Sequence, residues 1–449
     1  MASIMIKPLP LSLVVVLGIV VRLLHLIPGD HYGILGIDSY YFHHMAENPG
    51  SVEGSGLVYP LIWLGKLITL DYACYVLPVI IAVIGILAIY WVVSRLFDPL
   101  VGLYAAFAWA LLPNSVIITT AGFIDRDGLN VLLISSGVFA FWLLKDKCWT
   151  LAGLLPVAIG ELVVFEWCWV GRWILVGLIM SVFLSTGFTR LKRLPLKPLS
   201  IVIVGSMLLA VIAGGIESNT QQTLDMANPV SVTSTTYAEI HHITPQYVVA
   251  WYGFFLLPLI VGIIMVCKNR TDAGMFALFW FGGGFGLALL AERCLIFALP
   301  GAVMLIGLCL ASFTKGLYTD AVKKAAIGIL GACLIMLVGS SYLQGYRLAD
   351  FRGMSPNENW IDGLEYLRNE TPVESRVLCH WDYGYWVLDI ADRTPILKGG
   401  MENTEDYDAD DIPTTMIDYH ADYFIGVVSD CDGCNIKYIN NTVMVLKGD

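Results

Sequence analysis

Two short acidic segments near the start of the chain could hold a metal ion. Asp38 lies among apolar and aromatic residues, where a carboxylate is poorly solvated and needs a partner. Asp125 and Asp127 form an Asp-x-Asp pair in a glycine-bounded turn, and two carboxylates at this spacing can face one Mg²⁺ or Mn²⁺ ion. Both segments also have a simpler interpretation, as residues that cap a helix or complement its dipole. The residues alone leave these alternatives open.

Two further charged residues lie in or beside the segments predicted to face the outer side. Glu239 follows a loop rich in Ser, Thr and Asn, and could act as a ligand, a general base or a hydrogen-bond acceptor. Arg293 stands at the start of an apolar run, where its planar guanidinium could bind a phosphate through two hydrogen bonds. The alternative for Arg293 is an arginine that extends to the membrane surface and pairs with Glu292.

A dense aromatic segment follows much later in the chain. Residues 379–386 read Cys-His-Trp-Asp-Tyr-Gly-Tyr-Trp. Aromatic faces supply contact area, and a carboxylate accepts a hydrogen bond from a hydroxyl or amide group, so this composition indicates a recognition pocket. A plain core strand would alternate polar and apolar residues and would not place Asp382 directly beside Trp381.

The composition shows what kind of scaffold must position these side chains. The chain has 449 residues, of which 57% are hydrophobic and 14% charged, whereas soluble domains have about 45–50% and about 25%. A soluble enzyme is therefore excluded, and a polytopic α-helical membrane protein is predicted. The residues after 346 carry 8 basic and 20 acidic side chains. We therefore predict a nearly neutral membrane domain over 1–346 and an acidic soluble domain over 347–449, neither with a basic field suited to nucleic acid.

Hydropathy and charge predict the topology. Apolar runs that approach the ~20 residues needed to cross a bilayer occur at 8–28, 73–94, 99–118, 129–144, 149–169, 173–189, 199–216, 246–267, 273–291, 294–313 and 325–345. The short run 57–70 is predicted to be re-entrant or interfacial. Basic clusters follow every second run, which places the N-terminus in the cytoplasm and the acidic domain outside. The candidate acids and Arg293 then share the outer side with that domain.

Taken together, these motifs resemble the catalytic subunit of oligosaccharyltransferase, in a short form of the archaeal single-subunit type. The segment Trp381-Asp382-Tyr383-Gly384 resembles the WWDYG signature of that family, and the acidic motifs occur in the family's order. The resemblance implies a GT-C fold of about 11–13 transmembrane helices with a small C-terminal extracytoplasmic α/β domain. It also implies a multi-pass protein of the cell membrane.

The resemblance further implies an activity and residue roles. The family transfers a glycan, with inversion, from a polyprenyl (dolichyl) phosphate or pyrophosphate to the asparagine amide of Asn-x-Ser/Thr, and other subunits are not expected to be required. The implied metal ligands for Mn²⁺ or Mg²⁺ are Asp38, Asp125 and Asp127. Asp38 and Glu239 would activate the acceptor amide, and Arg293 would bind the lipid phosphate. The residues implied to bind the acceptor sequon are His380, Trp381, Asp382 and Tyr383, with Tyr385 as a further candidate.

The sequence departs from the family pattern at two points, and one other function is compatible with the motifs. His380 stands where the family has its first Trp, and no second acceptor-binding motif follows it. The alternative function is another lipid-phosphate-sugar glycosyltransferase of the same architecture, similar to protein O-mannosyltransferases. A transporter is disfavoured because the candidate charged residues lie at one face of the membrane and the sequence has no internal repeat.

Overall fold

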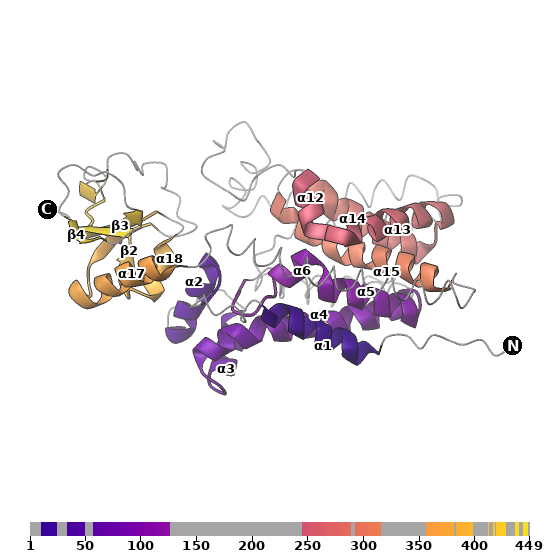
Figure 1. The fold of residues 1–449 in the computed structure, drawn as a ribbon, viewed down its shortest axis with the longest axis horizontal. Coiled ribbons are helices and arrows are strands. Elements are labelled where there is room, and N and C mark those ends of the chain that lie inside the picture. Colours follow the sequence, from indigo (N-terminus) through magenta and orange to yellow (C-terminus); the bar gives the residue numbers. More distant parts are fainter. Residues whose placement is uncertain are drawn as a thin grey trace, which may run out of the picture. The chain divides into compact units, whose positions relative to one another are not determined.

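The computed structural model describes residues 10–24, 34–49, 57–125, 245–288, 292–315, 356–380, 383–397, 412, 416–417, 419–427, 436–439 and 443–447. The chain falls into two compact units, one of Met1–Leu24, Val79–Thr119 and Arg126–Gly345, and a second of His25–Pro78, Thr120–Asp125 and Tyr346–Asp449. The second unit therefore joins the C-terminal residues to two segments from the first third of the chain. Figure 1 shows the elements of both units in chain order.

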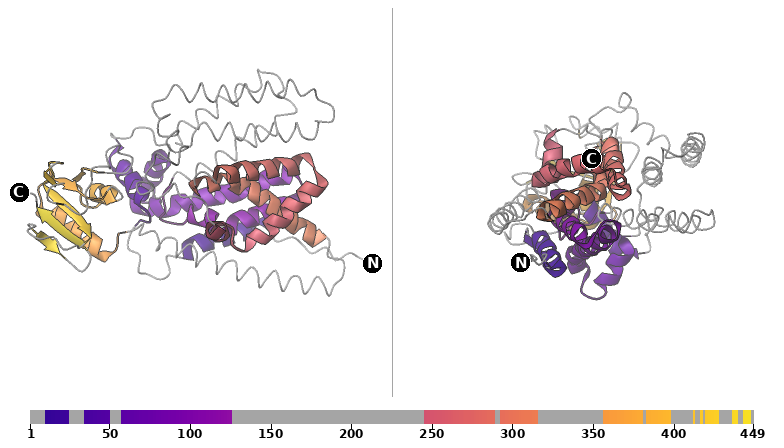
Figure 2. Two further views of the ribbon diagram at one scale, coloured as in Figure 1. Left: turned by 90° about the horizontal axis from the view of Figure 1, so that it is seen from above. Right: turned by 90° about the vertical axis from the view of Figure 1, so that its right-hand side faces the viewer.

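The first unit is helical. Its helices are α1 (Leu11–Leu23), the larger part of α4 (Leu70–Leu96), α5 (Pro99–Leu111), α6 (Pro113–Ile117), α12 (Pro245–Tyr252), η3 (Gly253–Phe255), α13 (Leu256–Asn269), α14 (Asp272–Ala288), η4 (Glu292–Ala298) and α15 (Leu299–Lys315). Helix α15 packs against α5, α13 and α14, as both views of Figure 2 show. At one crossing, a Cβ atom on Gly307 would come within 2.7 Å of the Val101 carbonyl oxygen. Small residues that let helix backbones approach closely are typical of membrane bundles.

Several described helices coincide with the predicted membrane spans. Within the described ranges, three segments are long and apolar enough to cross a bilayer: Leu70–Leu96, Val248–Asn269 and Leu295–Lys315. The predicted run 99–118 is divided between α5 and α6, because Pro113 forces the preceding Leu112 into an extended conformation (ψ 128°). The runs predicted at 129–144, 149–169, 173–189, 199–216 and 325–345 lie outside the described residues.

The second unit contains a mixed sheet. Strands β1 (Arg376–Leu378), β2 (Thr394–Pro395), β3 (Tyr423–Val427), β4 (Ile436–Ile439) and β5 (Val443–Lys447) lie in the order β2-β1-β3-β5-β4. Strand β1 is parallel to β2 and β3, whereas β5 is antiparallel to β3 and β4. The amphipathic helix α17 (Glu358–Glu370) contacts β4 and β5. Its buried face carries Trp360, Leu364 and Leu367.

The same unit holds three short helices, two of which carry candidate residues. Helix α2 (Ile37–Glu47) contains Asp38, and α18 (Gly384–Asp389) follows the aromatic motif. The two helices pack against each other, and α2 also contacts α3 (Val58–Gly65). Helix α3 lies in the run 57–70 predicted to be re-entrant or interfacial, and its eight residues are too few to cross a bilayer.

Candidate active site

Asp38 and Asp125 lie on two segments that bind each other through the backbone. The amide of Leu35 donates a 2.8 Å hydrogen bond to the carbonyl oxygen of Gly122, and Leu35 forms a parallel bridge with Phe123. These bonds join the residues just before Asp38 to those just before Asp125. Two carboxylates separated by 87 positions in the sequence thus belong to paired backbone segments.

Two glycines allow this close approach. Gly36 has φ +87° and Gly122 has φ +85°, a region that L side chains rarely adopt. A Cβ atom on Gly36 would come within 2.9 Å of the Phe123 ring. A Cβ atom on Gly122 would come within 3.0 Å of the Tyr75 ring. Glycine is therefore required at both positions by conformation as well as by space.

A serine adjacent to Asp38 completes the junction. The hydroxyl of Ser39 accepts a hydrogen bond from the amide of Ile124 and donates one to its carbonyl oxygen. Ser39 and Ile124 are both 1% exposed. Because each is the immediate neighbour of a candidate ligand, this pair of bonds fixes the backbone of Asp38 against that of Asp125. The sequence analysis did not identify Ser39 as a positioning residue.

Asp38 sits in the first turn of α2, but it is not the cap of that helix. The N-cap residue is Gly36, which offers no side-chain cap hydrogen bond. The capping alternative for Asp38 is thus wrong, although its charge still complements the positive end of the helix dipole. Both Asp38 and Asp125 are partly buried.

The aromatic motif forms a packed cluster. Tyr383 stacks on Trp386 at a centroid distance of 4.9 Å, and Trp360 from α17 lies 4.5 Å from Tyr383. Tyr40 of α2 meets the edge of Trp386 at 6.4 Å. Burial of the Tyr40 hydroxyl, reinforced by the charge of Asp389, raises its pKa. These contacts give Tyr383 a structural role in addition to the binding role predicted for it.

The other motif residues lie at the edge of this cluster. His380 follows β1, is partly buried, and accepts a hydrogen bond from the amide of Tyr383 through its backbone oxygen. Tyr385 packs against Tyr41 of α2 at 5.0 Å. The sequence analysis missed Trp360, whose signal was the burial expected of a large aromatic residue in an amphipathic helix. It included Trp386 in the aromatic segment but assigned it no role of its own.

Five of the predicted site residues cannot be placed by their side chains. Four lie outside the described residues altogether: Asp127, Glu239, Trp381 and Asp382. Arg293 lies in η4, where the backbone but not the side chain is described. The structure therefore brings together Asp38 and Asp125, and groups His380, Tyr383 and Tyr385 around α18, in one compact unit.

Part of the chain that carries the candidate site matches a known protein family. Residues 40–255 match the family model described as oligosaccharyl transferase STT3, N-terminal. This region is an STT3-family domain. It begins at α2, two residues after Asp38, and includes both Asp125 and the segment that contains Glu239. The family resemblance predicted from the motifs is confirmed.

Relatives and solved structures agree with the STT3 assignment. Dolichyl-phosphooligosaccharide-protein glycotransferase 2 of Pyrococcus furiosus is 27% identical over 109 residues, which make up 24% of this chain and 14% of that relative. The oligosaccharyltransferase of Archaeoglobus fulgidus in the apo form superposes with a TM-score of 0.73 at 16% identity, over 93% of this chain and 69% of its own. ArnT of Cupriavidus metallidurans, bound to undecaprenyl phosphate, gives 0.60 at 11% identity, over 97% of each chain.

These likenesses confirm the predicted fold. At such low identities they show architecture alone, which is the GT-C arrangement of membrane glycosyltransferases, to which this chain adds a unit with a five-stranded sheet. The A. fulgidus protein has further been solved with an inhibitory peptide and a dolichol-phosphate, and with Zn and sulfate. The chain thus has the fold of membrane glycosyltransferases, and its residues 40–255 match the STT3 family model.

Proposed function

We propose that the chain is an oligosaccharyltransferase that moves a glycan from a polyprenyl (dolichyl) phosphate or pyrophosphate to the asparagine amide of an Asn-x-Ser/Thr acceptor, with inversion. The observation that carries the proposal is the backbone junction at Ser39 and Ile124, because it pairs the segment of Asp38, just before the region that matches the STT3 family model, with the segment of Asp125 inside that region. The dolichol-phosphate and peptide bound by the A. fulgidus protein support the choice of donor and acceptor classes.

The residues fit a hard divalent cation, which the proposal takes to be Mn²⁺ or Mg²⁺. Asp38 and Asp125 are partly buried oxygen donors on two paired segments, and Asp127, two positions later in the sequence, is the third proposed carboxylate ligand. When bound, such an ion supplies positive charge that stabilises the leaving phosphate. In the proposal, Arg293 adds a second positive charge by hydrogen bonding to that phosphate.

The acceptor is handled by other residues of the chain. Asp38 and Glu239 accept hydrogen bonds from the acceptor carboxamide, which orients its weakly nucleophilic nitrogen toward the anomeric carbon. Trp381 and Asp382, beside His380 and the Tyr383 cluster, receive the Ser or Thr hydroxyl of the sequon. A site built to bond that hydroxyl rejects analogues lacking it, because a buried acceptor would remain unpaired. The proposed orientation places this site and the C-terminal residues outside the cytoplasm.

An assay with purified full-length protein tests the proposal. Lipid-linked glycan, Mn²⁺ and a fluorescent peptide are combined, and transfer to Asn-Ala-Thr is compared with transfer to Asn-Ala-Ala. We expect Asp125→Asn to abolish transfer, while Asp272→Asn, an exposed acid in the first turn of α14, retains it. Full activity in Asp125→Asn, or equal use of both peptides, would reject the mechanism.

The same assay addresses the second candidate function. The fold is shared with ArnT, whose structure holds undecaprenyl phosphate, so a GT-C enzyme acting on another acceptor has structural support. Modification of a peptide that contains Ser and Thr but no Asn would favour an enzyme similar to protein O-mannosyltransferases. Modification of Asn alone favours the oligosaccharyltransferase.

A further inference from the structure

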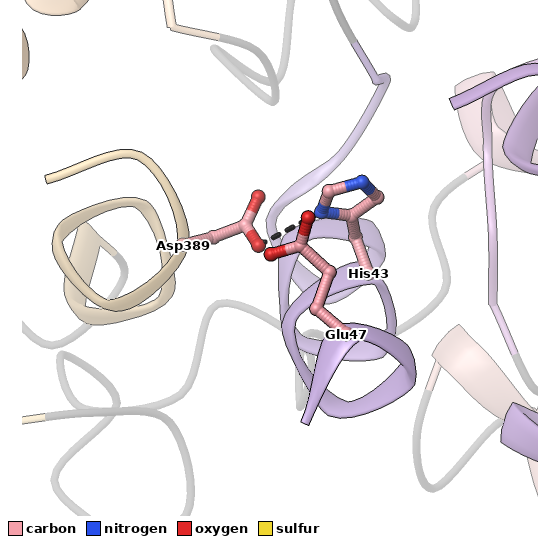
Figure 3. Close-up of side chains that lie close together, drawn as sticks. All are labelled: His43, Glu47 and Asp389. Carbon is pink, nitrogen blue, oxygen red and sulfur yellow. Dashed lines mark hydrogen bonds and ion pairs between the residues drawn. The ribbon is translucent and has the colours of Figure 1, made fainter. Parts of the chain in front are cut away.

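A second group of potential metal ligands lies on the helix that carries Asp38. His43 and Glu47 are four residues apart on α2 and therefore share one face of the helix. Asp389, the last residue of α18, approaches that face from the other helix (Figure 3). The three side chains come from positions as much as 346 residues apart, and all belong to the same compact unit.

The ligand atoms are close enough to share one ion. His43 Nδ1 lies 2.9 Å from Asp389 Oδ1, and one atom of each of the three side chains lies within 4.8 Å of the other two. Ligands around a tetrahedral ion with bonds of about 2.0–2.1 Å are separated by about 3.4 Å, so only a small adjustment is needed. The side chains of His43 and Asp389 are 11% and 6% exposed, whereas Glu47 is exposed. An ion can therefore approach from the side of Glu47.

The other ring nitrogen of His43 faces a further carboxylate. Nε2 lies 3.3 Å from Asp71 Oδ1, a distance typical of an ion pair, although within the described residues Nε2 makes no well-directed hydrogen bond. Metal-binding histidines commonly present their second nitrogen to a carboxylate, which fixes the tautomer and the ring orientation. Asp71 is the carboxylate that would fix the ring in this way if Nδ1 of His43 binds the metal.

The local charge also favours a bound cation. The side chain of Asp389 is almost fully buried, and a buried carboxylate is costly unless it is paired. A proton on His43 offsets one of the three surrounding negative charges, whereas a divalent ion offsets two. Burial alone would lower the pKa of His43, but the hydrogen bond and charge of Asp389, with smaller effects from Glu47 and Asp71, raise it. Proton and metal would therefore compete for Nδ1.

We propose that His43, Glu47 and Asp389 bind a Zn²⁺-type ion that links α2 to α18. One imidazole nitrogen and two carboxylates suit Zn²⁺, whereas Mg²⁺ prefers oxygen ligands alone. The site is separate from the proposed Asp38 site, since five helical residues place His43 about 140° around α2 and roughly 7.5 Å along it from Asp38. The ion would hold the helix of Asp38 against the helix that follows the Trp381-Asp382-Tyr383 motif.

Zinc binding by the full-length protein in detergent tests this site. After metal removal, bound Zn²⁺ is counted by elemental analysis following dialysis, at a pH slightly above neutral. We expect His43→Gln to lose one ion per chain, and Glu47→Gln, at an exposed position, to weaken that ion at least tenfold. His44→Gln is the matched control, because it changes the neighbouring histidine of the same helix, which is not one of the three ligands.

A second readout and a second variant remove the remaining ambiguity. Zn²⁺ should raise the melting temperature of the wild type and of His44→Gln, but not that of His43→Gln. Asp125→Asn should keep the ion whether or not it still transfers glycan. This result is therefore independent of the proposed function. Unchanged zinc content in both His43→Gln and Glu47→Gln would overturn the proposal and leave a protonated His43 as the bridge. Loss of the ion in Asp125→Asn alone would also overturn it.

Discussion

The hydroxyl of Ser39 accepts a 2.7 Å hydrogen bond from the amide of Ile124 and donates a 3.0 Å hydrogen bond to the carbonyl oxygen of the same residue. One side chain thereby satisfies both backbone groups of a buried residue 85 positions away. Since Asp38 and Asp125 are the direct neighbours of this pair, the geometry of the proposed metal site depends on a residue that need not touch the metal.

Replacement of Ser39 by Ala should disturb that geometry. It leaves the amide and carbonyl of Ile124 unpaired, at a cost of about 1–3 kcal/mol each if no water enters. We expect glycan transfer to fall about tenfold or more, with a higher Mn²⁺ concentration needed for half-maximal rate. Ser94→Ala is a suitable control, because the buried Ser94 hydroxyl has no hydrogen-bond partner among the described residues. An unchanged Mn²⁺ dependence in Ser39→Ala would contradict the positioning role.

Gly36→Ala should destabilise the junction through the backbone. The positive φ of Gly36 and the 2.9 Å approach to the Phe123 ring both oppose a Cβ atom, and we expect a loss of about 1–3 kcal/mol. Gly282→Ala on α14 is the matched control, since a Cβ atom there meets nothing within 4 Å and Ala favours a helix. Thermal unfolding in detergent measures both. A melting temperature equal to that of the wild type in Gly36→Ala would show that the loop can be rearranged.

Arg22→Met should destabilise the helical unit. Arg22 is fully buried and donates five hydrogen bonds, to the backbone oxygens of Gly18, Ala110 and Ser115 and to the hydroxyls of Ser115 and Thr119. We expect a loss of at least about 2 kcal/mol, because hydrogen bonds to charged groups contribute about 1.5–3 kcal/mol each. The control is Arg95→Met, an exposed arginine that lies over the Trp91 ring. The two variants are compared by urea-induced unfolding, and equal stability would refute the role of Arg22.

The contribution of Asp98 should depend on pH. Its side chain caps α5 through the amides of Leu100 and Val101 and accepts a 2.7 Å hydrogen bond from Lys315. Partial burial opposes ionisation, but Lys315 and the backbone amides outweigh it and lower the pKa of Asp98. The resulting stabilisation is present above the ordinary aspartate pKa and is lost as the pH falls through the lowered value.

Two substitutions separate the cap from the ion pair. Asp98→Asn keeps a capping oxygen but loses the charge, and we expect a cost below about 1 kcal/mol at neutral pH because Lys315 is largely exposed. Asp98→Ala also removes the cap, which adds about 1 kcal/mol. Melting temperatures measured across the acid range should converge for wild type and Asp98→Asn. A constant difference at all pH values would exclude the charge as its origin.

Hydropathy predicted the long helices correctly because bilayer thickness sets their length, and α4, α13 and α15 needed little else. The motifs predicted the family because five charged and aromatic segments occur in a fixed order. Nothing in the spacing of Ser39 and Ile124, or of His43 and Asp389, indicated that they meet. Such pairs depend on long-range backbone docking, which leaves no periodic signal in the sequence. The capping interpretation of Asp38 was wrong because the N-cap position is held by Gly36, which has a positive φ and directly follows the bridge between Leu35 and Phe123.

The buried guanidinium of Arg22 also has a consequence for the time course of biosynthesis. Its partners at Ala110, Ser115 and Thr119 are made 88 or more residues later. At about 5–20 residues per second, that delay is roughly 4–18 s. During this interval α1 carries a charge that costs about 2.5–3.5 kcal/mol at the centre of a membrane helix. Helix α1 should therefore stay close to the insertion machinery, or remain near the membrane surface, until α5 and α6 arrive to receive it.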